Sequence, residues 1–290
     1  MRFKDLYFFA FLVILTFYSF KPITQSAPLL GIATSLDRDS IVYSSGFRML
    51  GESVRKMLSP TLTDKVFNEN VKQIKTAKCK VIMCNLFYPG TLKIAGPDVN
   101  EEKVLAYSDS VLYRAGQAGV KFIVLGSGGS RNIPAGYDLS KAESDFISLG
   151  KRLGSLARKH NVTIVFENLE KTETNFITSL KSAASIVRRV NDANFRLNAD
   201  VFHMMREGEL PSEIIAAGKL VAFCELAEKE KRSLPGVMGD DFKPYLRALK
   251  KIKYNGFIFI EGNIVDANVE IPNAFKYLSG QIREVYTENK

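Results

Sequence analysis

The stretch TIVFENL (163–169) starts with an apolar, β-branched run and ends near a carboxylate, Glu167. The stretch FRLNADV (195–201) repeats that arrangement with Asp200. Between them, apolar residues from Phe176 to Val190 recur with the spacing of one helix face. Continuous apolar runs of this length are typical of parallel strands covered on both faces. The sequence therefore predicts a strand–helix–strand unit here.

The same alternation extends over the whole chain. A doubly wound open sheet is the alternative fold, but the glycine-rich turn that usually follows its first strand is absent. Eight strand–helix units match a (β/α)8 TIM barrel, which takes about 250 residues. We predict an α/β fold with a single barrel over residues 28–290. The other six predicted strands are LLGIATS (29–35), MLGESV (49–54), CKVIMCNLF (79–87), KFIVLGS (121–127), LVAFCELAE (220–228) and GFIFIEG (256–262).

Helical spacing between the strands supports this prediction. One apolar stripe runs from Val104 to Ala115. A further helix is expected from Leu139 to Lys159, and a final one from about Asn273 to Thr287.

The amino-acid composition excludes several classes of protein. Of 290 residues, 46% are hydrophobic and 24% are charged, which excludes a disordered chain and a multi-span membrane protein. The net charge of +9 is spread along the chain, so it suits loose attraction to anionic surfaces and does not argue for nucleic acid. The 3 cysteines cannot form a disulfide framework, and the 2 histidines exclude a site that needs many imidazoles.

The N-terminus resembles a targeting segment. An uncharged run from Leu6 to Phe20 follows Arg2 and Lys4, and it is shorter than the roughly 20 residues of a comfortable membrane span. A polar stretch with small residues comes next. We predict that residues 1–27 are a secretory signal peptide cleaved near Ala27, with an uncleaved N-terminal anchor as the alternative. Either case predicts export to the periplasm or the medium, and membrane contact only if the segment is retained.

Four carboxylates fall at the ends of the last four predicted strands. In TIM barrels the reacting groups lie at the carboxyl ends of the strands. Acidic side chains within apolar strands are costly unless they are paired or bind a metal. A strand-end carboxylate that pairs with a nearby Lys or Arg is the ordinary explanation for each residue alone. Their common position predicts one metal site formed by Glu167, Asp200, Glu225 and Glu261.

Motifs around these residues resemble those of the xylose isomerase-like barrels, the sugar phosphate isomerase/epimerase superfamily. VFENLEKTETNFITSL (165–180) is similar to that family's fifth-strand segment, and NADVFHMM (198–205) to its sixth. By this resemblance Glu167 and Asp200 are metal ligands. Glu173 is then a residue that contacts substrate, and His203 either contacts substrate or supports a metal ligand from behind.

The later motifs extend the resemblance to about residues 29–285. CELAEKEKRSLPG (224–236) resembles the seventh-strand motif and implies that Arg232 binds substrate. FIFIEG (257–262) resembles the eighth strand, which implies that Glu261 is the fourth ligand. The family has a histidine as its third ligand, whereas this chain has Glu225. A carboxylate there shifts the metal preference toward hard cations, Mn²⁺ or Mg²⁺, with Zn²⁺ still open.

The resemblance also implies a mechanism. Glu167 and Glu261 would exchange a proton beside a sugar carbonyl, through a metal-stabilised enediolate, in an isomerase or epimerase reaction. A sugar-binding barrel without turnover remains an alternative because of Glu225, as does a dehydratase or lyase on the same scaffold. A small-molecule sugar or sugar derivative is the expected partner, and homo-oligomerisation stays open.

The glycine-rich segment GSGGSR (126–131) allows two interpretations. Its backbone N–H groups could meet an anion or a sugar hydroxyl, with Arg131 assisting. The segment could equally be a barrel-mouth loop in which glycine only permits the turn. It is not a Walker loop, because no Gly-Lys-Ser/Thr follows.

Overall fold

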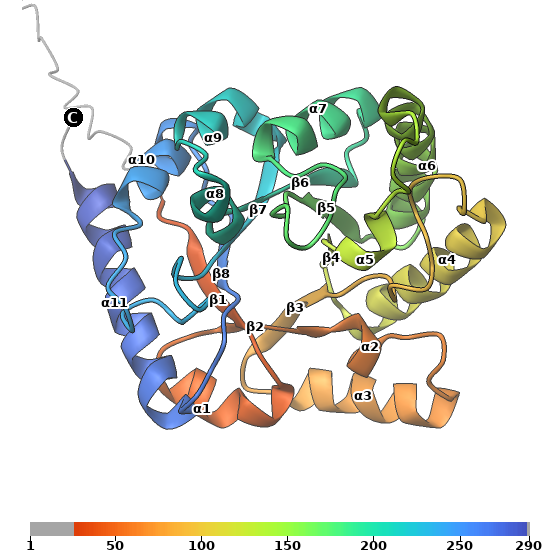
Figure 1. The fold of residues 1–290 in the computed structure, drawn as a ribbon. Helices are drawn as coiled ribbons and strands as arrows, with labels where there is room; N and C mark the ends of the chain where they lie inside the picture. Colours follow the sequence, from red (N-terminus) through yellow and green to blue (C-terminus); the bar gives the residue numbers. More distant parts are fainter. Residues whose placement is uncertain (1–25, 289–290) are drawn as a thin grey trace, which may run out of the picture.

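The computed structural model describes residues 26–288, and eight parallel strands close into a barrel in which each pairs with its sequence neighbours and β1 pairs with β8 (Figure 1). This confirms the predicted (β/α)8 barrel. The predicted N-terminal segment lies outside the described residues, apart from Ser26 and Ala27. The strands are β1 Leu29–Ala33, β2 Met49–Ser53, β3 Lys80–Asn85, β4 Phe122–Leu125, β5 Thr163–Glu167, β6 Phe195–Asp200, β7 Val221–Leu226 and β8 Phe257–Ile260.

Helices surround the barrel and bury their apolar stripes against it (Figure 1). The helices in the described part of the chain lack the length and apolar character needed to cross a bilayer. They are α1 Asp39–Ser44, α2 Val54–Met57, α3 Asp64–Thr76, α4 Glu101–Ala118, α5 Gly128–Arg131, α6 Leu139–Lys159, α7 Leu180–Val190, α8 Val201–Glu207, α9 Ser212–Ala217, α10 Lys243–Lys251 and α11 Ala267–Thr287, with 3-10 turns η1 Leu36–Arg38 and η2 Gly218–Leu220.

Several boundaries differ from the sequence prediction. Strand β3 stops at Asn85 because Leu86 adopts a positive φ of 55°, which breaks the extended backbone. Helix α11 begins at Ala267, six residues before the predicted Asn273, with the Asp266 side chain capping the first turn. Pro272 lies in the second turn of this helix, where it removes one backbone hydrogen bond, and does not mark the helix start.

The lower part of the barrel interior is filled with apolar side chains. Residues alternate along each strand, so every second side chain points inward. Val165, Phe223 and Phe259 form a buried inner cluster with Met83 and Val124. This cluster supports the polar residues that lie further along the same strands.

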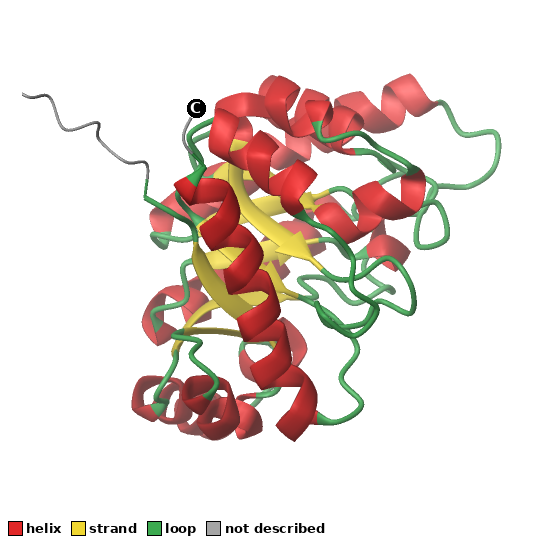
Figure 2. Ribbon diagram, turned by 90° about the vertical axis from the view of Figure 1, so that its left-hand side faces the viewer, coloured by secondary structure: helices red, strands yellow, loops and turns green. Residues whose placement is uncertain are grey.

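Figure 2 shows the strands pointing toward a side of the molecule that is rich in loops. The described chain starts on the opposite side, and α11 ends there too. Loops that follow strands therefore gather at one end of the barrel, where catalytic groups of this fold are found.

We expect Gly31→Ala to destabilise the barrel. Gly31 pairs with Phe259 across the β1–β8 closure, and a Cβ at residue 31 would lie 2.4 Å from the Phe259 ring. Overpacking of this kind costs about 1–3 kcal/mol. Urea unfolding should show the loss, and adding Phe259→Leu should cost less than the two single changes summed.

Gly280→Ala in α11 is the matched control for Gly31→Ala. A Cβ there meets nothing within 4 Å, so the change should be neutral or stabilise by up to about 1 kcal/mol. An unchanged unfolding midpoint for Gly31→Ala would contradict the close ring contact.

Candidate functional site

Four carboxylates from neighbouring strands meet at the loop-rich end of the barrel. Glu167 and Asp200 are the last residues of β5 and β6, Glu225 lies one residue before the end of β7, and Glu261 directly follows β8. One oxygen of each carboxylate lies within 4.8 Å of an oxygen of every other. The structure thus brings together all four residues that the sequence grouped.

Strand register explains this convergence. Glu167 pairs with Asn198, and Asp200 pairs with Glu225. Because side chains alternate along a strand, Asn198 and Asp200 both point into the barrel. The pairing sets these side chains at similar heights above the inner apolar cluster.

Glu225 has the most enclosed carboxylate of the four. Its side chain is fully buried, and one oxygen accepts a hydrogen bond from the Asn198 amide. Its other oxygen, Oε1, has no hydrogen-bond partner among the described residues. Burial, followed by the charges of Glu261, Glu167 and Asp200, raises the pKa of Glu225 well above its usual value.

The pKa of Glu167 is raised in the same way as that of Glu225. Burial raises its pKa well above the ordinary value, and the charges of Asp200 and Glu261 add to the effect. Gly126 leaves room for this carboxylate, since a Cβ at residue 126 would lie 2.2 Å from Glu167 Oε2. The glycine therefore permits the close approach of this carboxylate, which would have to shift if residue 126 carried a Cβ.

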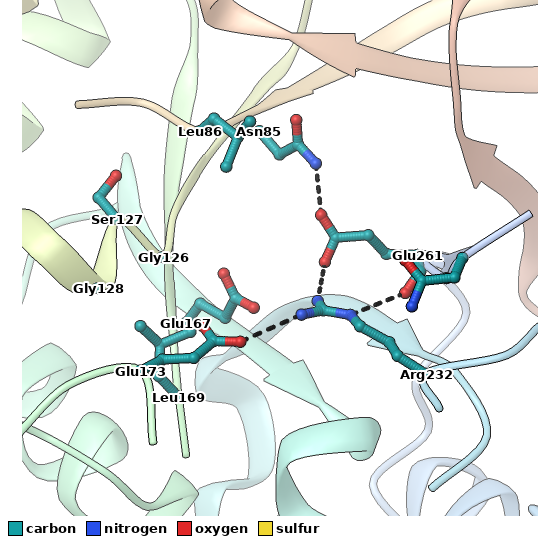
Figure 3. A pocket seen from close by; sticks show the side chains of 12 residues that line it. Asn85, Leu86, Gly126, Ser127, Gly128, Glu167, Leu169, Glu173, Arg232 and Glu261 are labelled. Carbon is teal, nitrogen blue, oxygen red and sulfur yellow. Dashed lines mark hydrogen bonds and ion pairs between the residues drawn. The ribbon is translucent and has the colours of Figure 1, made fainter. Parts of the chain in front are cut away.

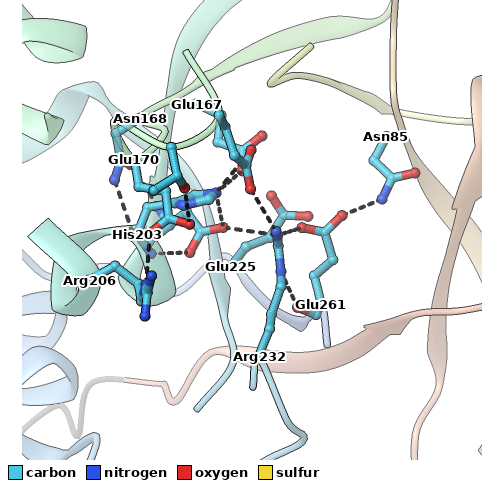
Figure 4. Close-up of polar contacts among 12 residues, drawn as sticks. Asn85, Glu167, Asn168, Glu170, His203, Arg206, Glu225, Arg232 and Glu261 are labelled. Atoms are coloured by element: carbon cyan, nitrogen blue, oxygen red, sulfur yellow. Dashed lines mark hydrogen bonds and ion pairs between the residues drawn. The ribbon is translucent and has the colours of Figure 1, made fainter. Parts of the chain in front are cut away.

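Arg232 lies among the carboxylates (Figures 3 and 4). Its guanidinium pairs with the Glu261 carboxylate and lies 3.3 Å from Glu173 Oε1 and 3.8 Å from Asp200 Oδ2. Burial opposes its charge, but the surrounding carboxylates outweigh burial and raise the pKa of Arg232. It is the cation that offsets part of the cluster's negative charge, and it also stacks over the Phe202 ring at 4.7 Å.

A pocket of about 310 Å³ opens above this cluster (Figure 3). Glu167 and Glu173 line it from one side and Glu261 from another, with the Arg232 guanidinium between them. Polar groups and glycines dominate its lining, with Leu86 and Leu169 as the apolar contribution. The remaining lining residues are Asn85, Gly126, Ser127, Gly128, Gly262 and Asn263.

His203 lies behind the pocket and does not line it. Its ring is fully buried, and Nε2 lies 3.5 Å from Glu167 Oε1 and 3.7 Å from Asp200 Oδ2. Neither ring nitrogen has a hydrogen-bond partner among the described residues. The predicted direct contact of His203 with substrate therefore stays a prediction, while its place beside two candidate ligands is a feature of the structure.

The glycine-rich segment forms a short helix, α5, whose Arg131 is fully buried. Arg131 donates a 2.9 Å hydrogen bond to the Glu167 carbonyl and stacks over Phe166 at 4.9 Å. Burial lowers its pKa to about 10, although Glu167 and Glu173 favour the charged form. Arg131 thus supports the end of β5 from behind and does not line the pocket.

Sequence reasoning missed the amides and one carboxylate that support the site. Asn85 donates to the Glu261 carboxylate and Asn198 to Glu225. Glu228 is fully buried and accepts hydrogen bonds from Ser233 Oγ and from the Gly236 and Gly239 backbone N–H groups. Asn198 within β6 and Asn85 at the end of β3 are polar residues in apolar strands, which was a usable signal. Glu228 depends on loop geometry that the sequence does not specify.

The carboxylate cluster fits a divalent cation. Oxygens that share one hard cation bind at about 2.0–2.6 Å, so they lie at most about 4–5 Å apart. The four carboxylates meet that limit, and the unpartnered Oε1 of Glu225 offers a free ligand atom. An all-oxygen donor set favours Mg²⁺ or Mn²⁺.

Residues 42–279 match the family described as the xylose isomerase-like TIM barrel. The chain belongs to this family. It is 26% identical over 161 residues to an L-ribulose 3-epimerase of Methylomonas sp. (strain DH-1), a match that covers 55% of each chain. The chain therefore aligns with about half the length of this curated relative.

Solved structures share the fold over a longer range. A structure of L-ribulose 3-epimerase superposes with a TM-score of 0.77 at 15% identity, covering 89% of this chain and 95% of that one. A structure of the IOLI protein with a bound zinc atom gives a TM-score of 0.70 at 17% identity, covering 89% of this chain and 98% of that one. These likenesses confirm the fold.

Glu225→Gln should stabilise the metal-free protein, and increasingly so as the pH rises. The folded state raises the pKa of Glu225, so the folding stability linked to this group is present at low pH. That stability is lost as the pH rises above the normal pKa of a glutamate toward the raised folded value. Each unit of pKa elevation corresponds to about 1.4 kcal/mol. Urea unfolding in a chelator at several pH values measures the difference from the native chain.

Glu143→Gln on α6 is a control for the Glu225 experiment, because Glu143 lies outside the cluster and is partly exposed. Its unfolding free energy should follow that of the native chain at every pH. A Glu225→Gln protein whose advantage stays constant with pH would refute the elevated pKa.

Arg232→Ala should bind Mn²⁺ more tightly than the native chain. The guanidinium offsets the negative charge of the cluster and repels a second cation, so its removal leaves the carboxylates free for the metal. We expect a gain of about tenfold or more in calorimetric affinity, equal to about 1.4 kcal/mol. Arg206→Ala, which removes a cation paired with Glu170 outside the four-carboxylate cluster, should change the affinity little. Weaker binding by Arg232→Ala would contradict this role.

Proposed function

We propose that this protein is a metal-dependent epimerase or isomerase of small sugars. The observation that carries the proposal is the pair Glu167 and Glu261, which line one polar pocket from different sides. The relative named L-ribulose 3-epimerase supports a ketose as the substrate class. The pocket volume of about 310 Å³ suits a single sugar unit.

The two glutamates can move a proton between the two faces of a bound sugar. One carboxylate removes the proton from the carbon beside the carbonyl, and the other returns a proton. Return to the same carbon from the opposite face inverts that centre, whereas return to the neighbouring carbon gives the isomer. The raised pKa of Glu167 makes it a stronger base than an exposed glutamate, which suits proton removal from carbon.

Glu167, Asp200, Glu225 and Glu261 would hold the divalent cation. When bound, it would polarise the carbonyl oxygen and make the adjacent C–H more acidic. Mn²⁺ and Mg²⁺ suit this donor set best, and Zn²⁺ is the third candidate. The zinc atom of the IOLI structure supports divalent metal binding on this scaffold.

The remaining pocket residues orient the substrate. Arg232 and Asn85 can donate hydrogen bonds to sugar oxygens, and Glu173 can accept one from a hydroxyl. The carboxylates outnumber the guanidinium in this pocket, so it disfavours a phosphate or carboxylate group on the ligand. We therefore favour an uncharged ketose over a sugar phosphate.

Sugar binding without turnover is the second candidate. Glu225 stands where the resembled family has histidine, and it adds a negative charge to the centre. Arg232 already pairs with one candidate ligand, Glu261. Both features would also suit a barrel that binds a sugar with Arg232 as the resident cation.

We also propose that the protein acts outside the cytoplasm. The uncharged run from Leu6 to Phe20, preceded by Arg2 and Lys4, supports export. Free sugars fit an exported enzyme better than phosphorylated intermediates do. Expression with a C-terminal tag, followed by fractionation and N-terminal sequencing, tests export and cleavage near Ala27.

Solvent deuterium incorporation into ketoses tests the proposed reaction. The native chain with Mn²⁺ should place deuterium on the carbon beside the carbonyl of at least one ketose in a panel that includes L-ribulose. Glu167→Gln and Glu261→Gln should each lose about 10²–10⁴-fold in rate, since they lack the proton carrier. Mn²⁺ affinities measured in parallel separate lost proton transfer from lost metal.

Glu102→Gln is the matched control, because Glu102 is exposed at the start of α4. It should keep the native rate. Sugar binding without deuterium incorporation in the native chain would overturn the enzyme proposal and favour the binding barrel.

A further inference from the structure

The two ends of the barrel carry opposite charge. The loop-rich end holds the buried carboxylates of the site. The opposite end, where the strands begin, presents exposed basic side chains that form no ion pair within residues 26–288. These residues, here called the basic face, are Arg48, Lys78, Lys80, Lys121, Lys219 and Lys253.

Helix capping explains only part of the basic face. Basic residues are favoured near helix C-termini, and these helices end at the same side as the strands begin. Lys80, however, is the first residue of β3, while Arg48 and Lys121 directly precede β2 and β4. Arg48 donates a 3.1 Å hydrogen bond to the Tyr43 carbonyl in the last turn of α1. Lys80 and Lys121 lie outside the helices, so the helix dipole does not account for these two lysines.

Two carboxylates near the basic face already have partners within the chain. Asp39 accepts hydrogen bonds from the backbone N–H groups of Lys78 and Cys79. Asp192 pairs with Arg158, which is a further cation of this end. Asp39 thus leaves one negative charge beside the six basic side chains of the face, none of which forms an ion pair within residues 26–288.

The chain enters the barrel at this same end (Figure 2). Leu29, the first residue of β1, is 51% exposed, and Tyr43 in α1 is 39% exposed beside Arg48. Tyrosines of this kind suit a boundary between water and lipid. Eight residues, 21–28, separate Leu29 from Phe20, the end of the uncharged run, so the linker reaches at most about 30 Å.

A shallow apolar hollow of about 310 Å³ lies at this end between the starts of β3 and β4 and the ends of α3 and α4. Ile74, Val81 and Ile82 contribute to its lining. Lys80 and Lys121 also line it. An apolar floor with neighbouring cations matches the chemistry of an anionic lipid surface, which offers phosphate above hydrocarbon.

We propose that, in the form of the chain that retains residues 1–27, the basic face docks on an anionic bilayer surface, with this N-terminal segment as its attachment and the sugar pocket facing away into water. The attraction comes from the unpaired lysines and arginines and falls off within about 10 Å, so docking requires that the linker keep the face close. This arrangement goes beyond the proposed epimerase activity and does not depend on it. The acidic mouth then lies on the side remote from the negative membrane.

Lysine labelling of the full chain on vesicles tests the proposal. Residues 1–290 are reconstituted with vesicles of phosphatidylcholine alone, and with vesicles that also contain phosphatidylglycerol. A water-soluble amine-acylating reagent and mass spectrometry then report the exposure of each lysine. In the anionic vesicles, Lys80, Lys121 and Lys253 should be acylated roughly fivefold more slowly, and high salt should restore the rate.

Lys65 and Lys141 are the internal controls, because they lie at the starts of α3 and α6, on the side of the pocket. Their labelling should be the same on both kinds of vesicle. Lys80→Glu with Lys121→Glu should abolish the protection of Lys253, whereas Lys65→Glu with Lys141→Glu should preserve it. Of the four substituted lysines, only Lys141 forms an ion pair within residues 26–288, and its partner is Asp145. Circular dichroism verifies that both double variants are folded.

Three results would overturn the proposal. Equal labelling of the two ends on anionic vesicles would mean that the basic face is not docked. Equal protection on neutral and anionic vesicles would mean that charge does not hold it. Failure of the full chain to float with either vesicle would remove the attachment itself.

Discussion

Mutual repulsion among four carboxylates at one barrel mouth is the constraint on which the site depends. Burial raises the pKa values of Glu167 and Glu225, because neither charge is well solvated. A fold that collects such groups needs a cation among them. Arg232 supplies one positive charge, and a divalent ion would supply two more. Metal, guanidinium and protons therefore compete for the same oxygens.

In β5 and β7, an apolar residue that packs inside the barrel precedes the carboxylate of the site. Val165 lies two residues before Glu167, and Phe223 two residues before Glu225. The earlier residue fills the barrel interior, while the later one reaches the pocket or the cluster beneath it. The stability cost of the charged residues is thus confined to one end, above a closed apolar layer.

Periodicity made the architecture predictable from sequence. Continuous apolar runs separated by helical stripes specify a parallel barrel, and a carboxylate at the end of each late strand specifies a shared mouth. The geometry of loops was less accessible. Arg131 was expected as an anion-binding aid in one interpretation, yet it is buried behind β5 and holds the Glu167 carbonyl. For His203 the sequence left substrate contact and a place behind the metal ligands open, and the structure puts its ring beside Glu167 and Asp200.

Glu228 organises the segment that follows β7 at the barrel mouth. This one carboxylate accepts hydrogen bonds from the Ser233 hydroxyl and from the backbone N–H groups of Gly236, Met238, Gly239 and Asp240. Lys231 and Arg232, which lie between Glu228 and Ser233 in the sequence, have left-handed backbone angles. Other contacts hold the same segment, since Arg232 pairs with Glu261 and the Asp240 carbonyl accepts hydrogen bonds from Tyr277 and Gln281. A substitution of Glu228 would therefore release the backbone that positions Arg232, and would alter the pocket although Glu228 itself does not line it.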